Sequence, residues 1–213
     1  MNRALQKNEL SWDTLAQTVC DRIAQMTGNV MGPRQMPMIH ARLRRHLGEL
    51  RLEPSEYVAY WRANAATEDA ALIGLLTTHF TSFFREFLHF EWLATELPNL
   101  VATARQQNRH EIRIWSAACS RGQEVWSLAM WLSFHMPKIA PDFKWSVHGT
   151  DIDQGSVKQA INGVYHHREL ETAPRHLWQN HWQRGTGEIA DWMKVKQELR
   201  SHCHFGTGNL LAP

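Results

Sequence analysis

The sequence predicts an α/β fold in which an all-helical N-terminal domain precedes an incomplete sheet of parallel strands. Between Ser11 and about Thr77, apolar residues recur three to four positions apart, which is the spacing of amphipathic helices. From Ile112 onward, short apolar runs alternate with helical stripes, a pattern typical of the strand–helix–strand units that join parallel strands. With 213 residues, of which 43% are hydrophobic and 21% charged, the chain is able to bury a core.

The N-terminal domain is expected to span residues 1–77 and to consist of helices. Glycine and proline residues between positions 28 and 37 interrupt the helical pattern, and Thr67 with the two acids after it is a typical helix start. Helices are expected on the apolar stripes of residues 15–26 and 39–50, around residues 57–61 after Pro54, and over residues 70–76.

A linker helix and a connection are expected over residues 78–111, with a polar linker at residues 103–111. The partial sheet domain is expected to follow over residues 112–213. The linker helix is expected to carry the apolar residues Phe83, Phe84, Phe87, Leu88 and Trp92. Within the sheet domain, strands are expected at residues 112–118, 143–150 and 202–205, with helices beginning near Val125 and Ser156.

Composition narrows the class of protein. No run of about 18 uncharged apolar residues occurs, and the first 15 residues mix charges with apolar positions, so we expect no stable membrane insertion and place the chain in the cytoplasm. The net charge of +2 gives no reason to expect nucleic-acid binding. The three cysteines are far apart, and His202 and His204 flank a Cys203 that points the other way on a strand, so we expect no metal site.

Two loops at the ends of predicted strands are candidate ligand sites. Residues 117–124 join a strand to a helix through small residues and Gly122, an arrangement that lets a ligand approach the backbone, although a tight turn packed for steric reasons is an equal explanation. Asp151 and Asp153 follow the next strand, where an acid in a nucleotide-binding sheet accepts hydrogen bonds from ribose, unless they only cap the next helix. Asp151 lies 29 residues after Gly122 (151 minus 122), more than the spacing of about 20 in dinucleotide enzymes, so NAD is not favoured.

Two further segments can be interpreted structurally or functionally. Phe83 and Phe84 followed by Arg85 and Glu86 are typical of a core segment with a solvated ion pair. A basic helix face opposite the leucine stripe is either solvated or binds an acidic protein partner. That face is expected to comprise Arg34, His40, Arg42, Arg44, Arg45, His46 and Arg51.

Taken together, the segments resemble the chemotaxis receptor glutamate O-methyltransferases of the CheR type, from about Leu15 to Leu211. Residues 77–86 match the family pattern Thr-Thr-Asn-x-Thr-x-Phe-Phe-Arg-Glu, except that His79 stands in place of asparagine. Residues 114–124 resemble the family's cofactor loop, with Arg121 and Gln123 replacing a threonine and a glutamate. Residues 150–153, 184–187 and 209–211 also follow in the family's order and spacing.

The resemblance implies a Rossmann-like S-adenosylmethionine (SAM) methyltransferase sheet with a small antiparallel β insert at about residues 180–200. The implied reaction transfers a methyl group to glutamate side chains in the cytoplasmic domain of methyl-accepting chemoreceptors, and the chain is expected to be a monomer. Arg85 is implied to be catalytic, near the methyl group. The positions implied to contact SAM are His79, Thr81, Arg85, Glu124, Asp151, Asn209 and Leu210.

The resemblance also implies two receptor-binding surfaces. One is the basic helix with Arg42, Arg45 and Arg51. The other is the turn of the insert with Arg184, Gly185, Gly187 and Lys194, where Lys194 stands in place of the arginine of tail-binding members. Family sheets continue past residues 209–211, so we expect a C-terminally truncated chain that binds SAM weakly and methylates poorly. The alternative is a non-catalytic receptor-binding module or an inactive fragment.

Overall fold

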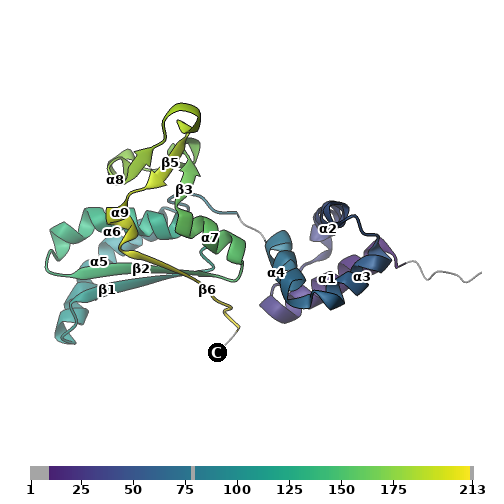
Figure 1. Cartoon of the computed structure of the whole chain (residues 1–213). Coiled ribbons are helices and arrows are strands. Elements are labelled where there is room, and N and C mark those ends of the chain that lie inside the picture. Colours follow the sequence, from purple (N-terminus) through teal and green to yellow (C-terminus); the bar gives the residue numbers. More distant parts are fainter. Residues whose placement is uncertain (1–9, 78–79, 212–213) are drawn as a thin grey trace, which may run out of the picture. The chain divides into compact units, whose positions relative to one another are not determined.

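The computed structural model describes residues 10–77 and 80–211. The chain divides into two compact units, one comprising Met1–Thr78 with Leu210–Pro213 and the other His79–Asn209. Figure 1 labels the elements of both units.

The first unit is helical, as its apolar spacing predicts. The Ser11 side chain caps the first helix by accepting a hydrogen bond from the Thr14 N–H, and Gly28 ends that helix with a φ of 72°. The described elements are α1 (Trp12–Thr27), the short 3-10 helix η1 (Pro33–Gln35), α2 (Met36–Leu50), α3 (Pro54–Ala63) and α4 (Ala65–Leu76). Their apolar stripes meet in one core, which includes Leu15, Val19, Ile23, Ile39, Leu43, Leu47, Tyr57, Leu72 and Leu76.

A buried carboxylate lies inside this helical unit. Glu68 in α4 is 3% exposed and accepts hydrogen bonds from the Tyr57 hydroxyl at 2.5 Å and from Nε2 of His46 at 2.6 Å. Burial, together with the neighbouring Glu68 carboxylate, raises the pKa of Tyr57, so the tyrosine remains a hydrogen-bond donor. Because a buried carboxylate without partners is very unfavourable, these bonds tie α2, α3 and α4 together.

The prediction of one solvated basic face on α2 is wrong for two of its members. His46 turns toward Glu68, and Arg42 donates hydrogen bonds to the backbone carbonyls of Leu75 at 2.7 Å and Thr77 at 3.3 Å. Arg42 therefore satisfies the carbonyl groups left free at the end of α4. Sequence periodicity does not reveal such a role, because it says nothing about which neighbouring helix ends beside a given side chain.

The second unit contains a parallel sheet with the strand order β1-β2-β6, where β1 is Glu111–Ala117, β2 is Lys144–Asp151 and β6 is Cys203–Thr207. Both strand pairs are parallel, with Ile114 opposite Val147 and Gly149 opposite Phe205. The predicted α/β fold class is confirmed. Among the described residues β2 is the central strand, and β1 lies at one edge of the sheet.

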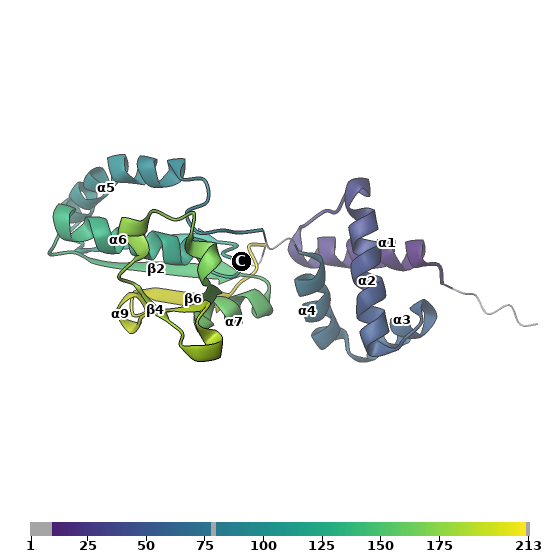
Figure 2. The same cartoon turned by 90° about the horizontal axis from the view of Figure 1, so that it is seen from above.

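Helices cover one face of this sheet (Figure 1). The helices of the second unit that frame it are α5 (Leu88–Gln106), α6 (Gln123–Ile139) and α7 (Gln154–Asn162). The Trp126 ring of α6 packs on Phe205 of β6 with ring centroids 5.2 Å apart, and a Cβ at Gly149 would come within 2.6 Å of a Val125 methyl. Gly149 therefore allows α6 to approach the sheet closely. Figure 2 shows α5 running beside α6.

The helix expected to carry the phenylalanines begins later and ends later than predicted. It starts at Leu88, so Phe83 and Phe84 lie in the turns before it, and it continues through Thr103 to Gln106, where a polar linker was expected. Its buried residues join the core of the second unit. Apolar positions at Leu93, Leu97 and Val101 continue the helical stripe, and this packing outweighs the polar character of the last turn.

The small antiparallel insert is confirmed as a separate sheet with the order β3-β5-β4. Its strands are β3 (Val164–His166), β4 (Trp182–Arg184) and β5 (Trp192–Val195), so the first strand lies earlier than the expected start near residue 180. Three residues are too few for an alternating pattern to be recognised. The remaining short helices of this region are η2 (His167–Leu170), α8 (Arg175–Trp178), η3 (Gly187–Ile189) and α9 (Gln197–Arg200).

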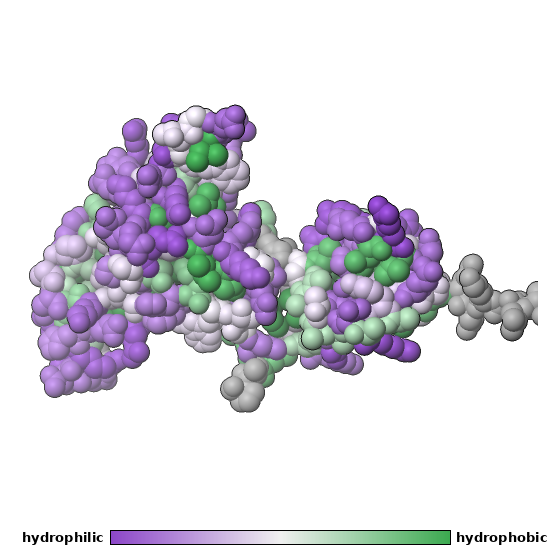
Figure 3. All heavy atoms as spheres, in the orientation of Figure 1, coloured by the Kyte–Doolittle hydropathy of each residue, from purple (hydrophilic) through white to green (hydrophobic). Residues whose placement is uncertain are grey.

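Hydrophilic residues predominate on the face seen in Figure 3, where hydrophobic residues form small patches. Within the described parts of the chain, we find no helix with the length and apolar character required to span a membrane. The exposed large hydrophobic side chains of the second unit include Leu88, Trp92 and Trp115.

The Glu68 network gives a stability prediction. Replacing Glu68→Gln removes the charged acceptor of Tyr57 and His46 and should lower the free energy of unfolding by about 1–3 kcal/mol. Urea denaturation followed by circular dichroism measures the change. Glu49→Gln is the matched control, because Glu49 is exposed and its ion pair with Arg45 is long, at 4.0 Å. Equal midpoints for the two variants would contradict the structural role of Glu68.

Candidate functional site

The loop between β1 and α6 has an unusual backbone. Ala118, Ser120 and Gly122 have φ angles of 58°, 50° and 89°, so every second residue lies in the left-handed region. Such conformations are unfavourable for non-glycine residues and persist only where the surroundings hold them. A Cβ at Gly122 would lie 2.7 Å from that of Ala160, so glycine is also required for the approach of α7.

Asp151 holds this loop in place. Its carboxylate accepts hydrogen bonds from the Ser120 N–H at 2.7 Å and from the Asp153 N–H at 2.9 Å, and the side chain is buried. Asp153, in contrast, caps α7 by accepting hydrogen bonds from the N–H groups of Gly155 and Ser156. The capping explanation that the sequence left open is thus correct for Asp153. Asp151 instead joins the ends of two neighbouring strands, and its carboxylate oxygens have lone pairs left for a further donor.

Glu124 stands in the first turn of α6, where a carboxylate is stabilised by the helix dipole. Its Oε1 accepts a hydrogen bond from the Ser116 hydroxyl at 2.7 Å. Because Ser116 is buried and fixed in β1, this bond restricts the direction of the Glu124 carboxylate. Glu124 itself is exposed. Glu124 is therefore available to a ligand in a defined orientation.

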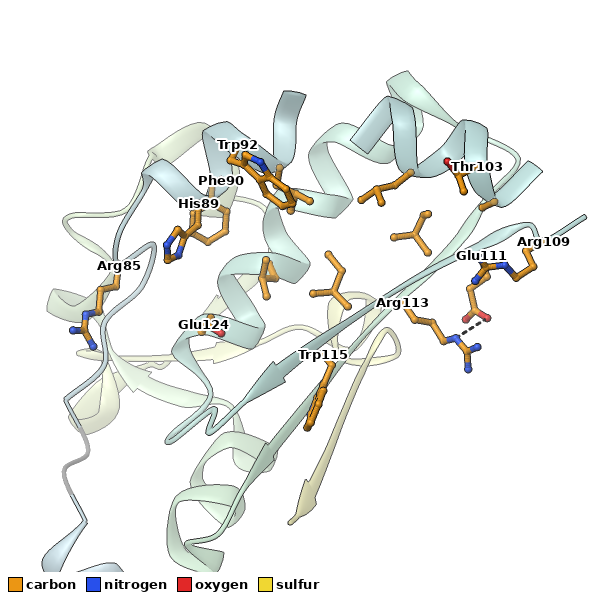
Figure 4. A pocket seen from close by; sticks show the side chains of 16 residues that line it. Arg85, His89, Phe90, Trp92, Thr103, Arg109, Glu111, Arg113, Trp115 and Glu124 are labelled. Atoms are coloured by element: carbon orange, nitrogen blue, oxygen red, sulfur yellow. Dashed lines mark ion pairs between the residues drawn. The ribbon is translucent and has the colours of Figure 1, made fainter. Parts of the chain in front are cut away.

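A pocket of about 650 Å³ lies between α5, β1 and the start of α6. In Figure 4, Arg85 and Glu124 lie at one end of it, and Arg109, Glu111 and Arg113 at the other. The remaining lining is mostly apolar and consists of His89, Phe90, Trp92, Leu93, Leu100, Thr103, Ala104, Ile112, Ile114, Trp115 and Leu128. An apolar cavity with a few charged groups at its ends is typical of a small-molecule site.

Arg85 sits on a strained turn. Phe84 and Glu86 on either side of it both have a φ of 52°. The buried Ser127 hydroxyl accepts a hydrogen bond from the Phe84 N–H at 2.9 Å, which anchors this turn to α6. The Arg85 guanidinium donates to the Phe80 carbonyl at 3.0 Å and lies 5.1 Å from the Phe80 ring and 3.6 Å from the Glu86 carboxylate. Its side chain is about half exposed, so it is accessible to an anionic group.

The other positions expected to contact a cofactor lie in different places, and one of them is outside the described residues. Asn209 follows Gly208, whose N–H donates to the Asp151 carbonyl at 2.9 Å, so it is brought to the strand ends. Thr81 is partly exposed and precedes the Arg85 turn, but it does not line the pocket. Leu210 belongs to the first compact unit and is not placed relative to the second. His79 lies outside the described residues.

The turn of the insert is closed by backbone contacts. Nε of Arg184 donates to the Ala190 carbonyl at 2.8 Å, and a Cβ at Gly185 would lie 2.1 Å from the Ile189 carbonyl oxygen. Only glycine therefore fits at position 185. Gly187 has a φ of 60°, which also favours glycine, and Lys194 is exposed on β5.

On the first unit, Arg45 and Arg51 remain at the surface, and Arg51 ends α2 with a φ of 58°. Arg44, another member of the expected basic face, lies over the Trp12 ring at 5.2 Å. The sequence also gave no reason to select Ser116, Ser120 or Ser127. Serines in and beside loops are too common for Ser116 and Ser120 to be recognised as site residues. Ser127 contacts Phe84, which lies 43 positions away in the chain.

Burial raises the pKa of the Cys119 thiol to about 12, and the neighbouring Asp151 carboxylate adds to this effect. A raised folded-state pKa stabilises the fold fully below the unfolded value near 9.0, and that stabilisation is lost as the pH rises toward 12. The thiol beside the loop is therefore neutral and unreactive near pH 7.

This gives a labelling prediction. Iodoacetamide should alkylate Cys119 at least about a hundredfold more slowly in the folded chain than in urea at pH 8, because the thiolate is the reactive form. Peptide mass spectrometry over time measures both rates on the same residue. Similar rates in the two states would show that the loop does not bury Cys119.

Comparison with known proteins matches the second part of the chain to a family and nearly the whole chain to several relatives. Residues 79–213 match the family described as "CheR methyltransferase, SAM binding domain". The chain is 35% identical to a chemotaxis protein methyltransferase of Salmonella typhimurium over 93% of its own length and 66% of the relative's. It is 35% identical to one of Escherichia coli over 94% and 67%, and 36% identical to chemotaxis protein methyltransferase 2 of Pseudomonas aeruginosa over 92% and 67%.

The chain thus spans about two thirds of the length of these curated relatives. The match contains the loop of Glu124, the Asp151 strand end and the Arg85 turn described above. The chain belongs to the CheR methyltransferase family, and its SAM-binding domain indicates S-adenosylmethionine as the cofactor.

Proposed function

We propose that the chain transfers the methyl group of SAM to glutamate side chains of chemoreceptors, forming methyl esters. The observation that carries this proposal is the placement of Asp151 at the end of β2 and of Glu124 in the first turn of α6, which follows the neighbouring parallel strand β1, in a domain that matches the SAM-binding domain of the family. Ligands of such sheets bind outside the carboxyl ends of the strands.

Several groups would hold SAM when it is bound. Asp151 has acceptor capacity for ribose hydroxyls beyond its two backbone bonds, and Glu124 has a carboxylate oriented by Ser116 for the amino group of the methionine part. Asn209 lies near the same edge through Gly208. We also propose contacts from His79, Thr81 and Leu210, on the strength of the sequence resemblance.

The reaction makes modest demands on the protein. A glutamate side chain is ionised near pH 7, so its carboxylate can attack the sulfonium methyl group without a general base. The bond from methyl carbon to sulfur breaks as the ester bond forms, and both electron pairs move in line. Catalysis then rests on alignment and exclusion of water. We propose that Arg85, exposed at the Glu124 end of the pocket, orients the incoming carboxylate.

Two surfaces are proposed for the receptor. On the first unit, Arg45 and Arg51 are exposed and can attract an acidic helix, whereas Arg42 donates to the carbonyl of Leu75 at the end of α4. On the insert, the turn with Arg184, Gly185 and Gly187 and the neighbouring Lys194 are proposed to bind the receptor's tail. We further propose that the chain acts as a monomer in the cytoplasm.

Cofactor binding tests the site. Isothermal titration calorimetry should detect SAM binding, and Glu124→Gln should weaken it at least about tenfold, because a charge-assisted hydrogen bond is lost. Glu188→Gln, an exposed acid of the insert, should have no effect. Binding that is equal in both variants would show that Glu124 does not hold the cofactor.

Methyl transfer tests the activity separately. Tritiated SAM and receptor-containing membranes should yield protein-bound methyl groups that alkali releases as methanol, as expected for an ester. Arg85→Ala should lower this rate by tenfold or more with a smaller change in SAM affinity, while Arg109→Ala, at the other end of the pocket, should not. SAM binding without any transfer would favour a non-catalytic receptor-binding module.

A further inference from the structure

A group of potential metal ligands lies in the β insert, away from the pocket. His166, His167 and Asp191 each offer a ligand atom, and these three atoms lie within 4.8 Å of one another. Among residues 10–77 and 80–211, this is the group of three or more histidine, cysteine or acidic side chains that meets such a spacing. Its members come from the end of β3, the start of η2 and the residue before β5.

The backbone of the insert holds these residues together. The His167 N–H donates to the Asp191 carbonyl at 2.8 Å, and His166 is paired with Trp192 across the β3–β5 ladder. The two imidazole rings stack with centroids 4.7 Å apart. The proximity of the three side chains therefore follows from sheet register and does not depend on a flexible loop.

The donor set suits a divalent transition metal. Two imidazole nitrogens and one carboxylate oxygen are ligands that Zn²⁺ accepts, with a fourth tetrahedral position left for water or another group. Both ring nitrogens of His167 have an acceptor nearby, since Nδ1 lies 3.3 Å from the Asp191 carbonyl and Nε2 lies 3.6 Å from the Glu171 carboxylate. Whichever nitrogen does not bind the ion therefore has an outer partner, as is typical of a metal-ligating histidine. Either contact can fix which nitrogen carries the proton.

A simpler explanation is a surface ion pair of protonated His167 with Asp191 and Glu171, both at 3.6 Å. Such pairs contribute little when exposed, and His166, which caps η2, takes no part in this one. His166 accepts a long hydrogen bond of 3.2 Å from the Arg168 N–H at its Nδ1. A metal bound at that ring would replace this single weak bond or require the ring to turn.

We propose that His166, His167 and Asp191 form a Zn²⁺ site that fastens the end of β3 to the start of β5. The bound ion would stiffen the sheet that also carries the Arg184–Gly187 turn and Lys194. This site is independent of SAM binding. The cysteine spacing and the His202–His204 segment had led us to expect no metal site. Asp191 lies 24 positions after His167, and no metal-binding motif connects them, so the sequence does not point to this group.

Zinc titration of the untagged chain, after removal of metals with a chelator, tests the proposal. Calorimetry at pH 7.5 should show one Zn²⁺ per chain, and the affinity should fall at pH 5.5, because protonated imidazoles cannot coordinate. His167→Asn and Asp191→Asn should each weaken binding at least tenfold. Co²⁺ in place of Zn²⁺ should give the visible absorption of a tetrahedral complex, and either variant should abolish it.

The matched control is His110→Asn, which removes another exposed histidine paired with an acid, at 3.9 Å from Asp142, but without a second imidazole beside it. Zinc affinity of this variant should equal that of the unaltered chain. Circular dichroism checks that every variant is folded, and the amide of Asp191→Asn preserves the size of the side chain. Several weak zinc sites that His167→Asn and Asp191→Asn leave unchanged would overturn the proposal and indicate adventitious surface binding.

Discussion

The candidate site depends on the hydrogen bonds that the Asp151 carboxylate accepts. This carboxylate accepts the N–H groups of Ser120 and Asp153, so one buried side chain fixes both the loop after β1 and the start of α7. The loop needs such an anchor because Ala118 and Ser120 adopt left-handed backbone conformations that are unfavourable without support. A carboxylate that already holds the backbone also has remaining lone pairs for a ligand, so structure and binding share one group.

The rest of the site is connected to this anchor through α6. Its N-terminal turn presents Glu124, oriented by Ser116, and one turn later Ser127 holds the Phe84 N–H. Arg85 thereby stands on a turn that is fastened to the same helix as Glu124. The close approach of α6 to the sheet at Gly149 keeps these contacts at fixed distances. The packing of α6 on the sheet therefore determines where the charged groups lie around the pocket.

The sequence predicts those parts of the fold that repeat a regular pattern. The helices of the first unit and the strands around Ile114, Val147 and Phe205 follow from apolar periodicity, and Asp151 follows from its position after a strand. The turn at Phe84 did not follow, because its geometry depends on a hydrogen bond to Ser127 that is distant in the chain. The three-residue strand at Val164–His166 is too short for a pattern, and the orientation of Arg42 depends on where α4 ends.

The central claim is that SAM binds at the carboxyl ends of β1 and β2. The most direct measurement is an NMR titration of the isotopically labelled chain with SAM, followed through its backbone amide signals. The account predicts that the largest shifts occur at the amides of residues 118–124 and 150–153, which include the Ser120 and Asp153 N–H groups that donate to the Asp151 carboxylate. Shifts confined to the helical unit or to the β insert, with the amides of Ser120 and Asp153 unchanged, would contradict it.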